Sequence, residues 1–303
     1  MQHLRMADPD SMRARFAPRF LVALLSAVAL AAAVCGCGST QATLDPIAQA
    51  AQATTHSGGS QIAMTASVQE PALGSFLTVR GNGSFNMSRQ EGELFFDIDG
   101  LPVAAQARLP GGHLQLTELF KDGVLYMGSP LFEGKLPGGA KWMKLDLTKV
   151  ESSLGIDVQS LSSGQSNPTE FLQYLRGSGG SVTAAGHERV RGIETTRYEG
   201  TVDLERAAQQ IPASDRGKLE AAIKQLIAKT GVRSYPVTVW IDDHHLVRRM
   251  EMKMTTSAGA GAGAATIDFE MFGFGASPGV NAPAAGETFD ATKLSLQSLA
   301  PGA

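Results

Sequence analysis

Residues 235–254, with the sequence YPVTVWIDDHHLVRRMEMKM, contain two runs in which apolar and polar side chains alternate. The apolar positions are Tyr235, Val237, Val239 and Ile241 in the first run and Leu246, Met250, Met252 and Met254 in the second. An alternation with a period of two is typical of a β-strand that buries one face and leaves the other in water. The polar residues between the runs, 242–245, suit a solvated turn. The stretch therefore predicts a β-hairpin with one apolar face.

The same alternation recurs from residue 61 to residue 274, without a linker that would separate two domains. Besides the hairpin, strands are predicted at 61–69, 77–87, 93–99, 113–120, 123–128, 140–145, 181–190, 193–204 and 267–271. Gly81 and Gly83 lie within one of these strands and permit either strong curvature or a bulge. The spacing of apolar residues predicts short helices at 44–55, 147–156, 168–176 and 215–229.

Many strands with few helices predict an α+β fold. We expect a large curved antiparallel sheet, a half-open β-barrel of about ten strands, with a few helices covering its concave face. The folded domain is expected to span residues 44–275, and the Pro-, Ala- and Gly-rich residues 276–303 are expected to form a tail.

The first 36 residues have the pattern of a lipoprotein signal peptide. Arginines precede an apolar run over residues 20–34, which as a helix of about 22 Å is too short to cross a bilayer comfortably. The run ends in Val34-Cys35-Gly36-Cys37, which resembles the bacterial lipobox. Cys37 is the better acceptor of diacylglycerol, because the register that ends at Cys35 places bulky Val34 where a small residue is needed. An uncleaved membrane anchor is the alternative.

Cleavage and lipidation would leave residues 37–43 as a tether between the membrane and the domain. Two acyl chains hold a protein stably on a membrane, whereas one gives only marginal binding. The expected location is therefore extracytoplasmic, at the outer face of the cytoplasmic membrane, with attachment through the N-terminal diacylglyceryl cysteine. Residues before Met12 add nothing to the signal, so that either Met1 or Met12 can be the start.

The charge and the motifs argue against several functions. The 303 residues include 26 basic and 29 acidic side chains, and a net charge of −3 does not suit nucleic acid as a partner. The histidines lack metal-ligand spacing, including those of the 242–245 run, which is expected to be a solvated turn. Glu93, Asp97 and Asp99 fall on the polar face of a strand, where solvation is expected. We therefore expect no metal and no cofactor.

Residues 275–279, with the sequence GASPG, formally match the Gly-x-Ser-x-Gly elbow of hydrolases. That motif requires a strand–turn–helix setting, whereas Pro278 and the tail follow Ser277 here. Acylation of Cys37 would also leave no free thiol for catalysis. We predict that the protein is not an enzyme, and a hydrolase that uses Ser277 with a histidine is the alternative.

The apolar side chains of the predicted strands share one face, which is either a packed core or the wall of a cavity. Methionines are frequent on it, and their flexible side chains suit ligands of variable shape as well as irregular cores. Arg248 is the one charge expected on this face, where it meets a ligand headgroup or reaches past the sheet into water. The residues expected to line a ligand cavity are Met64, Leu77, Val79, Phe85, Met87, Phe96, Tyr198, Val239, Met250, Met252, Phe269 and Met271.

The order of these features resembles that of the LppX/LprG-type envelope lipoproteins of actinobacteria, which have a fold similar to that of the lipoprotein carrier LolA. The local resemblance lies in residues 192–203 (GIETTRYEGTVD), 237–242 (VTVWID) and 246–249 (LVRR). It implies a half-open barrel that holds acyl chains, such as palmitate, of a lipid or glycolipid. It also implies lipid transport or presentation in the envelope, with an envelope transporter as a partner. A structural or sensor lipoprotein with a packed core and no lipid ligand is the alternative.

Overall fold

The computed structural model describes residues 46–70, 75–86, 89–107, 109–149, 182–209, 230–256, 263–275 and 279–292, with single positions between 220 and 228. The predicted signal peptide, Cys37 and the tether lie outside these residues. All described residues belong to the unit that begins at Cys35.

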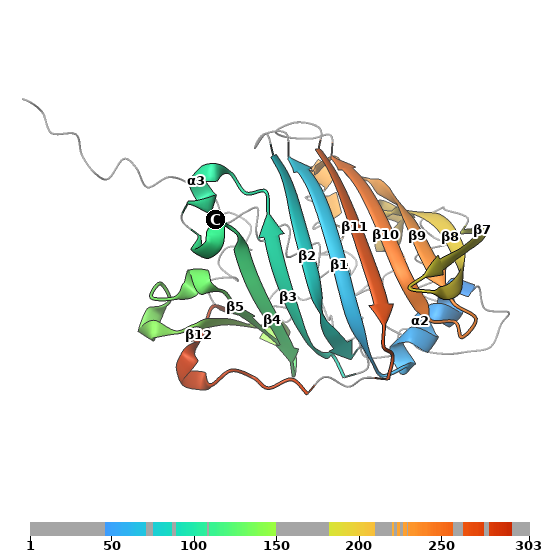
Figure 1. Ribbon diagram of the computed structural model, residues 1–303. Helices are drawn as coiled ribbons and strands as arrows, with labels where there is room; N and C mark the ends of the chain where they lie inside the picture. Colours follow the sequence, from blue (N-terminus) through green and yellow to red (C-terminus); the bar gives the residue numbers. More distant parts are fainter. Residues whose placement is uncertain are drawn as a thin grey trace, which may run out of the picture. The chain divides into compact units, whose positions relative to one another are not determined.

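Twelve strands form one open sheet in the order β12-β6-β5-β4-β3-β2-β1-β11-β10-β9-β8-β7 (Figure 1). The strands are β1 (Gly59–Glu70), β2 (Ser75–Asn86), β3 (Glu91–Asp99), β4 (Leu114–Lys121), β5 (Val124–Gly128), β6 (Trp142–Asp146), β7 (Thr183–Val190), β8 (Ile193–Asp203), β9 (Ser234–Ile241), β10 (Val247–Thr256), β11 (Gly263–Phe272) and β12 (Thr288–Asp290). The prediction of a large sheet that does not close into a barrel is confirmed.

The sheet consists of two meanders, β1 to β6 and β7 to β11, in which each strand pairs with the next one along the chain. The meanders meet where β1 pairs with β11, in a register that places Met64 opposite Phe269. All pairs are antiparallel except that of β12 with β6. Close to two hundred residues of chain separate β1 from β11, so that the contact between the meanders is non-local.

The edge strand β12 comes from the stretch that the sequence assigns to a tail. Residues 279–292 run back to the first meander, and the Lys121 ammonium donates a hydrogen bond of 2.8 Å to the carbonyl of Val280, which is buried. Phe289 pairs with Met143 of β6. The domain thus extends beyond residue 275, because a strand of three residues is too short to show an alternating pattern in the sequence.

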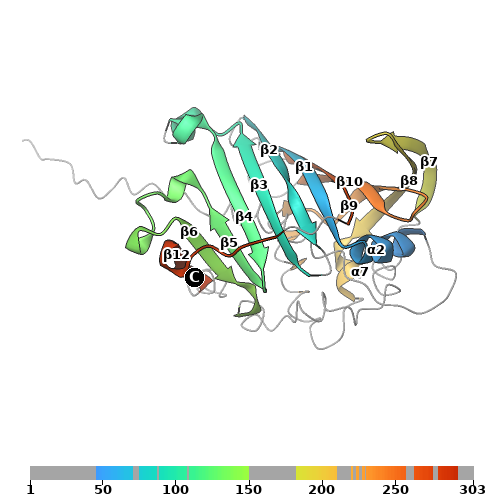
Figure 2. The same ribbon diagram turned by 60° about the horizontal axis from the view of Figure 1, so that its bottom comes forward.

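Helices pack against one side of the sheet, behind the face shown in Figure 1 (Figure 2). Ile47 and Ala50 of α2 (Pro46–His56) form a buried cluster with Ile241 of β9, and Leu204 of α7 (Leu204–Gln209) packs with Ile227 and Val232. The short helices are α3 (Val103–Gln106), η3 (Pro110–Gly112), η4 (Pro130–Phe132), η5 (Pro137–Gly139) and η6 (Ala285–Glu287). Within the described part of the chain, no helix combines the length and apolar character needed to cross a bilayer.

Two of the predicted helices can be compared with the structure. Helix 44–55 corresponds to α2, and the described positions between 220 and 230 are helical, as the prediction for 215–229 requires. Helix 147–156 is described only at residues 147–149, which are helical, and helix 168–176 lies outside the described residues.

Gly83 permits a close approach of two strands and does not form a bulge. β2 keeps an uninterrupted register with β1 and β3 through Gly81 and Gly83. A Cβ atom at position 83 would lie 2.0 Å from the carbonyl oxygen of Glu93 and 2.9 Å from the Cα of Leu94. Because both are backbone atoms, no side-chain rotation can relieve the overlap.

Gly83→Ala should therefore destabilise the fold, by about 1–3 kcal/mol as in other overpacked sites. The measurement is the free energy of unfolding in urea. Gly286→Ala is the matched control, because an added Cβ at Gly286 has no atom within 4 Å. Equal stability of the two variants would contradict the close approach at Gly83.

Candidate functional site

One side of the sheet carries a continuous set of apolar side chains, which we call the apolar face. Successive cross-strand partners on this face, from β7 to β4, are Ala184, Tyr198, Val239, Met250, Phe269, Met64, Gly81, Phe96 and Leu116. All predicted cavity-lining residues that the structure describes lie on this face: Met64, Leu77, Val79, Phe85, Phe96, Tyr198, Val239, Met250, Met252, Phe269 and Met271. Met87 lies outside the described residues.

Every methionine in the described part of the chain lies on the apolar face, at positions 64, 127, 143, 250, 252, 254 and 271. Met64, Met252 and Met271 are buried, and the other four are half-buried. Met127 and Met143 were not predicted to lie on this face, since the strands that carry them have only five residues each. These two face each other across β5 and β6 and extend the methionine-rich surface to the far end of the sheet.

The turn of the β9–β10 hairpin is closed by the buried carboxylate of Asp242. Its Oδ1 accepts hydrogen bonds from the backbone N–H groups of His244 and Leu246 at 3.0 and 2.8 Å. Its Oδ2 accepts from the Arg248 guanidinium at 2.6 Å, and that guanidinium also lies over the ring of Phe274. Asp242 therefore has a hydrogen-bond donor at each oxygen.

Arg248 does not extend into water, which is one of the two expectations for it. The register of β10 shifts between Val247 and Arg249, so that Arg248 is the extra residue of a bulge. Its side chain is 16% exposed and paired with Asp242. The expected solvated turn is found at Asp243 and His244, which extend into water.

A second buried carboxyl group, Glu118 of β4, lies on the apolar face and was not predicted. It is in register with Leu94 of β3 and Met127 of β5, and it is 9% exposed. Its Oε1 atom is fully buried and has no hydrogen-bond partner. The expectation that Arg248 is the one charged residue on this face is therefore wrong. The alternation Leu114-Leu116-Glu118-Phe120 contained the signal, because Glu118 occupies a position of the apolar set.

Burial governs the protonation of Glu118. It raises the pKa of this carboxyl from its ordinary value of 4.5 to about 7, because the ionised form loses its hydration and gains no partner. Between these two values the folded chain keeps a proton that the unfolded chain has released. The contribution of the neutral carboxyl to stability is therefore complete below about pH 4.5 and is lost as the pH rises through about 7.

Glu118→Gln should remove this pH dependence, because the amide does not ionise. The free energy of unfolding of the wild-type chain should fall, relative to that of the variant, by about 3 kcal/mol between pH 4 and pH 8. Denaturant titrations at several pH values measure the difference. Glu93→Gln is the control, since Glu93 lies on the opposite face of the sheet and should leave the wild-type dependence in place. Parallel curves for wild type and Glu118→Gln would show that Glu118 is not buried as described.

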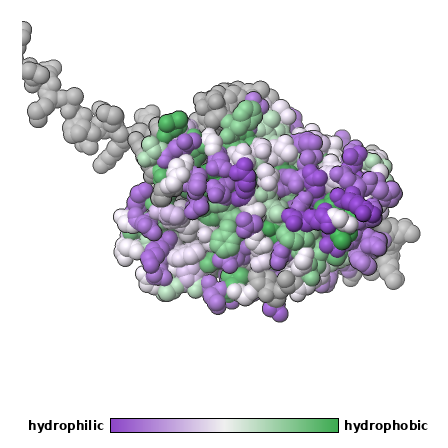
Figure 3. Space-filling view, viewed as in Figure 1, coloured by the Kyte–Doolittle hydropathy of each residue, from purple (hydrophilic) through white to green (hydrophobic). Residues whose placement is uncertain are grey.

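The opposite face of the sheet is more polar, and Figure 3 shows clusters of hydrophilic side chains on it among apolar ones. Arg249 pairs with Asp268 at 2.6 Å and lies over the ring of Trp240. The indole N–H of Trp240 in turn donates to Glu188 at 2.8 Å. Such pairs satisfy several of the long polar side chains of this face.

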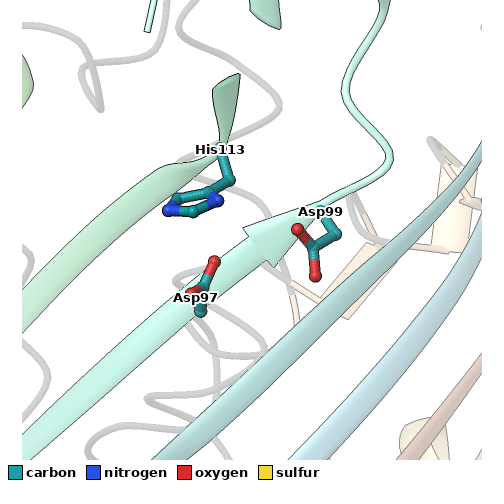
Figure 4. Close-up of side chains that lie close together, drawn as sticks. All are labelled: Asp97, Asp99 and His113. Atoms are coloured by element: carbon teal, nitrogen blue, oxygen red, sulfur yellow. The ribbon is translucent and has the colours of Figure 1, made fainter. Parts of the chain in front are cut away.

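Three potential ligands for a cation meet on the polar face, Asp97 and Asp99 of β3 and His113 just before β4 (Figure 4). One ligand atom from each lies within 4.8 Å of the others, and Oδ1 of Asp97 is buried without a hydrogen-bond partner. Sequence spacing did not reveal the group, because it forms across two strands. Arg80 pairs with Asp99 at 2.5 Å and supplies a positive charge. We assign no metal to this group, since these side chains are partly exposed and the arginine already neutralises one carboxylate.

A hollow of about 400 Å³ opens between β8, β9 and β10. Its lining includes Glu199, Thr238 and Glu251, together with Lys253, which pairs with Glu251 at 2.7 Å. The alternation of these strands places those side chains on the polar face. Charged walls do not suit an acyl chain, and we assign no ligand to the hollow.

The described residues add no arrangement of side chains that supports the alternative of a hydrolase. Ser277 lies outside the described residues. The ring of His187 lies 3.4 Å from the hydroxyl of Thr196, and His56 is bonded to the carbonyl of Gln52 in its own helix. These contacts are local to single elements or to neighbouring strands.

No protein-family profile matches the chain. A Streptomyces griseus protein described as "Uncharacterized 31.2 kDa protein in rplA-rplJ intergenic region" is 28% identical over 269 residues, covering 85% of this chain and 83% of the relative. Among solved structures, the chain is similar to the lipoprotein LppX of Mycobacterium tuberculosis, with 15% identity and a TM-score of 0.42, covering 78% of this chain and 96% of LppX. It is also similar to LprF of Mycobacterium bovis, with 16% identity and a TM-score of 0.38, covering 80% of this chain and 99% of LprF. The architecture described above rests on this chain's own strand pairing.

Proposed function

We propose that this protein is an envelope lipoprotein that binds an acyl-chain ligand on its apolar face and carries or presents lipid there. It acts by binding and not by catalysis. Lipidation of Cys37 holds the protein at the outer face of the cytoplasmic membrane, next to the lipids of that membrane.

The composition of the apolar face is the observation that supports the proposal. All described methionines lie there, four of them only half-buried, and aromatic rings such as those of Phe85 and Phe120, 5.9 Å apart, lie among them. Methionine has three rotatable bonds and a polarisable sulfur atom, so that such a surface adapts to a flexible chain. Sites for small molecules are mostly apolar with few polar groups, which agrees with one carboxyl among the apolar side chains of β3, β4 and β5.

A packed core without ligand is the second candidate. It is favoured by the low exposure of Met64, Met252 and Met271, each below a tenth, as in an ordinary protein interior. The two candidates differ in what happens when a large side chain is placed on the apolar face.

Met252→Trp tests the two candidates. The full chain purified from its own host should carry a bound lipid, detected by native mass spectrometry and identified after organic extraction. The variant should lose most of this lipid while unfolding at nearly the wild-type free energy, because the indole occupies the space of the ligand. Thr255→Trp is the control: Thr255 lies on the polar face of the same strand, and its variant should keep the lipid.

The packed-core candidate predicts a different outcome for the same proteins. No lipid accompanies the wild-type chain, and Met252→Trp loses about 1–3 kcal/mol of stability through overpacking. That pair of results would rule out lipid binding.

Anchoring depends on Cys37, which lies outside the described residues. Cys37→Ala should abolish incorporation of a labelled fatty acid and release the chain from the membrane fraction, because one unmodified cysteine provides no acyl chains. Intact-mass analysis of the wild type should give a diacylglyceryl cysteine as the first residue. Membrane partition that persists in Cys37→Ala would favour the uncleaved anchor.

A further inference from the structure

Among the described residues, the apolar face contains one buried side-chain atom without a hydrogen-bond partner, Oε1 of Glu118. Its cross-strand neighbours are Leu94 and Met127, and its neighbours along the same face of β4 are Leu116 and Phe120. The side chain is 9% exposed, and Oε1 is both buried and without a hydrogen-bond partner.

The fold provides a direct comparison in Asp242, a carboxylate that is also buried. Asp242 receives two backbone N–H groups and the Arg248 guanidinium, so that each of its oxygens has a donor. Glu118 has no basic side chain on the described part of its face on β3, β4 or β5. Native proteins pair nearly all buried polar atoms, and an exception calls for a partner from outside the chain or a functional role.

A leucine at position 118 would continue the pattern of Leu114 and Leu116 and would leave no polar atom unsatisfied. A carboxyl group there weakens the fold unless something outside the described chain hydrogen-bonds to it. The position lies on β4, in the first meander, on the face that we propose as the ligand site.

We propose that Glu118 anchors the ligand by a hydrogen bond from its neutral carboxyl to an uncharged oxygen of the lipid, such as an ester carbonyl or a hydroxyl. This inference rests on the proposed lipid-binding function and specifies the ligand class: a neutral, oxygen-bearing acyl lipid. A neutral carboxyl offers one O–H donor and acceptor oxygens, which suits esters and alcohols.

Burial without a counter-charge raises the pKa of Glu118 to about 7, so that the O–H donor is present in mildly acidic and near-neutral solution. An anionic headgroup would be repelled once the carboxyl ionises. A cationic headgroup would require the ionised form, which the apolar surroundings disfavour.

The test compares ligands that differ only in the polar group. The full chain is reconstituted in phosphatidylcholine vesicles, at about pH 6, that contain methyl palmitate or octadecane, two neutral molecules of similar length of which only the first has an ester. Occupancy by each is measured by native mass spectrometry after release from the vesicles. We expect the wild type to prefer methyl palmitate by about fivefold, the effect of one hydrogen bond.

Two variants separate the hydrogen bond from packing. Glu118→Leu should bind both probes equally, and Glu118→Gln should keep most of the preference, since its amide still offers a donor. Glu93→Leu, on the polar face beside β4, is the matched control and should keep the wild-type preference. The readout is a ratio of two ligands on the same protein, so a change in stability shared by both complexes does not alter it.

The possible results separate this inference from the proposed function. Equal occupancy of the wild type by both probes would overturn the role of Glu118 and leave lipid binding intact. A lack of occupancy by either probe and by phosphatidylcholine would overturn both. A stronger preference for palmitoylcholine than for methyl palmitate would show that Glu118 binds a cation, which also overturns the inference.

Discussion

The pairing of β1 with β11 is the contact on which the rest of the structure depends. It runs in unbroken register from Gln61 to Gln69 and joins two meanders that are each built from local hairpins. Without it, two smaller sheets would each expose a long edge with unpaired backbone groups. With it, alternate residues of twelve strands fall on common faces, so that Met64 of the first meander continues the surface formed by Phe269 and Met250 of the second.

The two faces of this sheet differ in how their polar side chains find partners. On the polar face, Arg249 pairs with Asp268 and lies over the ring of Trp240, and both members of this ion pair are partly exposed to water. On the other side, Asp242 is satisfied within its own turn, which fixes the end of the β9–β10 hairpin. Among the described inward residues of β3, β4 and β5, only Glu118 has a buried oxygen with neither water nor a hydrogen-bond partner. This difference from Asp242 is the reason to propose a ligand that supplies the partner.

The described helical cover is concentrated at the β8–β10 end, where Ile47 and Ala50 of α2 pack on Ile241. Glu118 lies in the other meander, several strands away. The described face therefore has two regions, one where α2 packs against β9 and one around β4, β5 and β6 that carries Met127, Met143 and the unsatisfied carboxyl.

The sequence by itself determined most of the strands, their two faces and which apolar residues share a face, because a period of two is a local property that each strand displays alone. It also predicted α2 from helical spacing. Only the tertiary structure decided that the residues around Phe289 join the sheet, that Asp97, Asp99 and His113 meet, and that Arg248 is paired with Asp242. Each of these depends on a bulge, a short edge strand or a cross-strand register, none of which leaves a periodic signal. The alternation of β4 already placed Glu118 among apolar positions, but its isolation from every described donor follows from the register of β3 and β5, which no single strand contains.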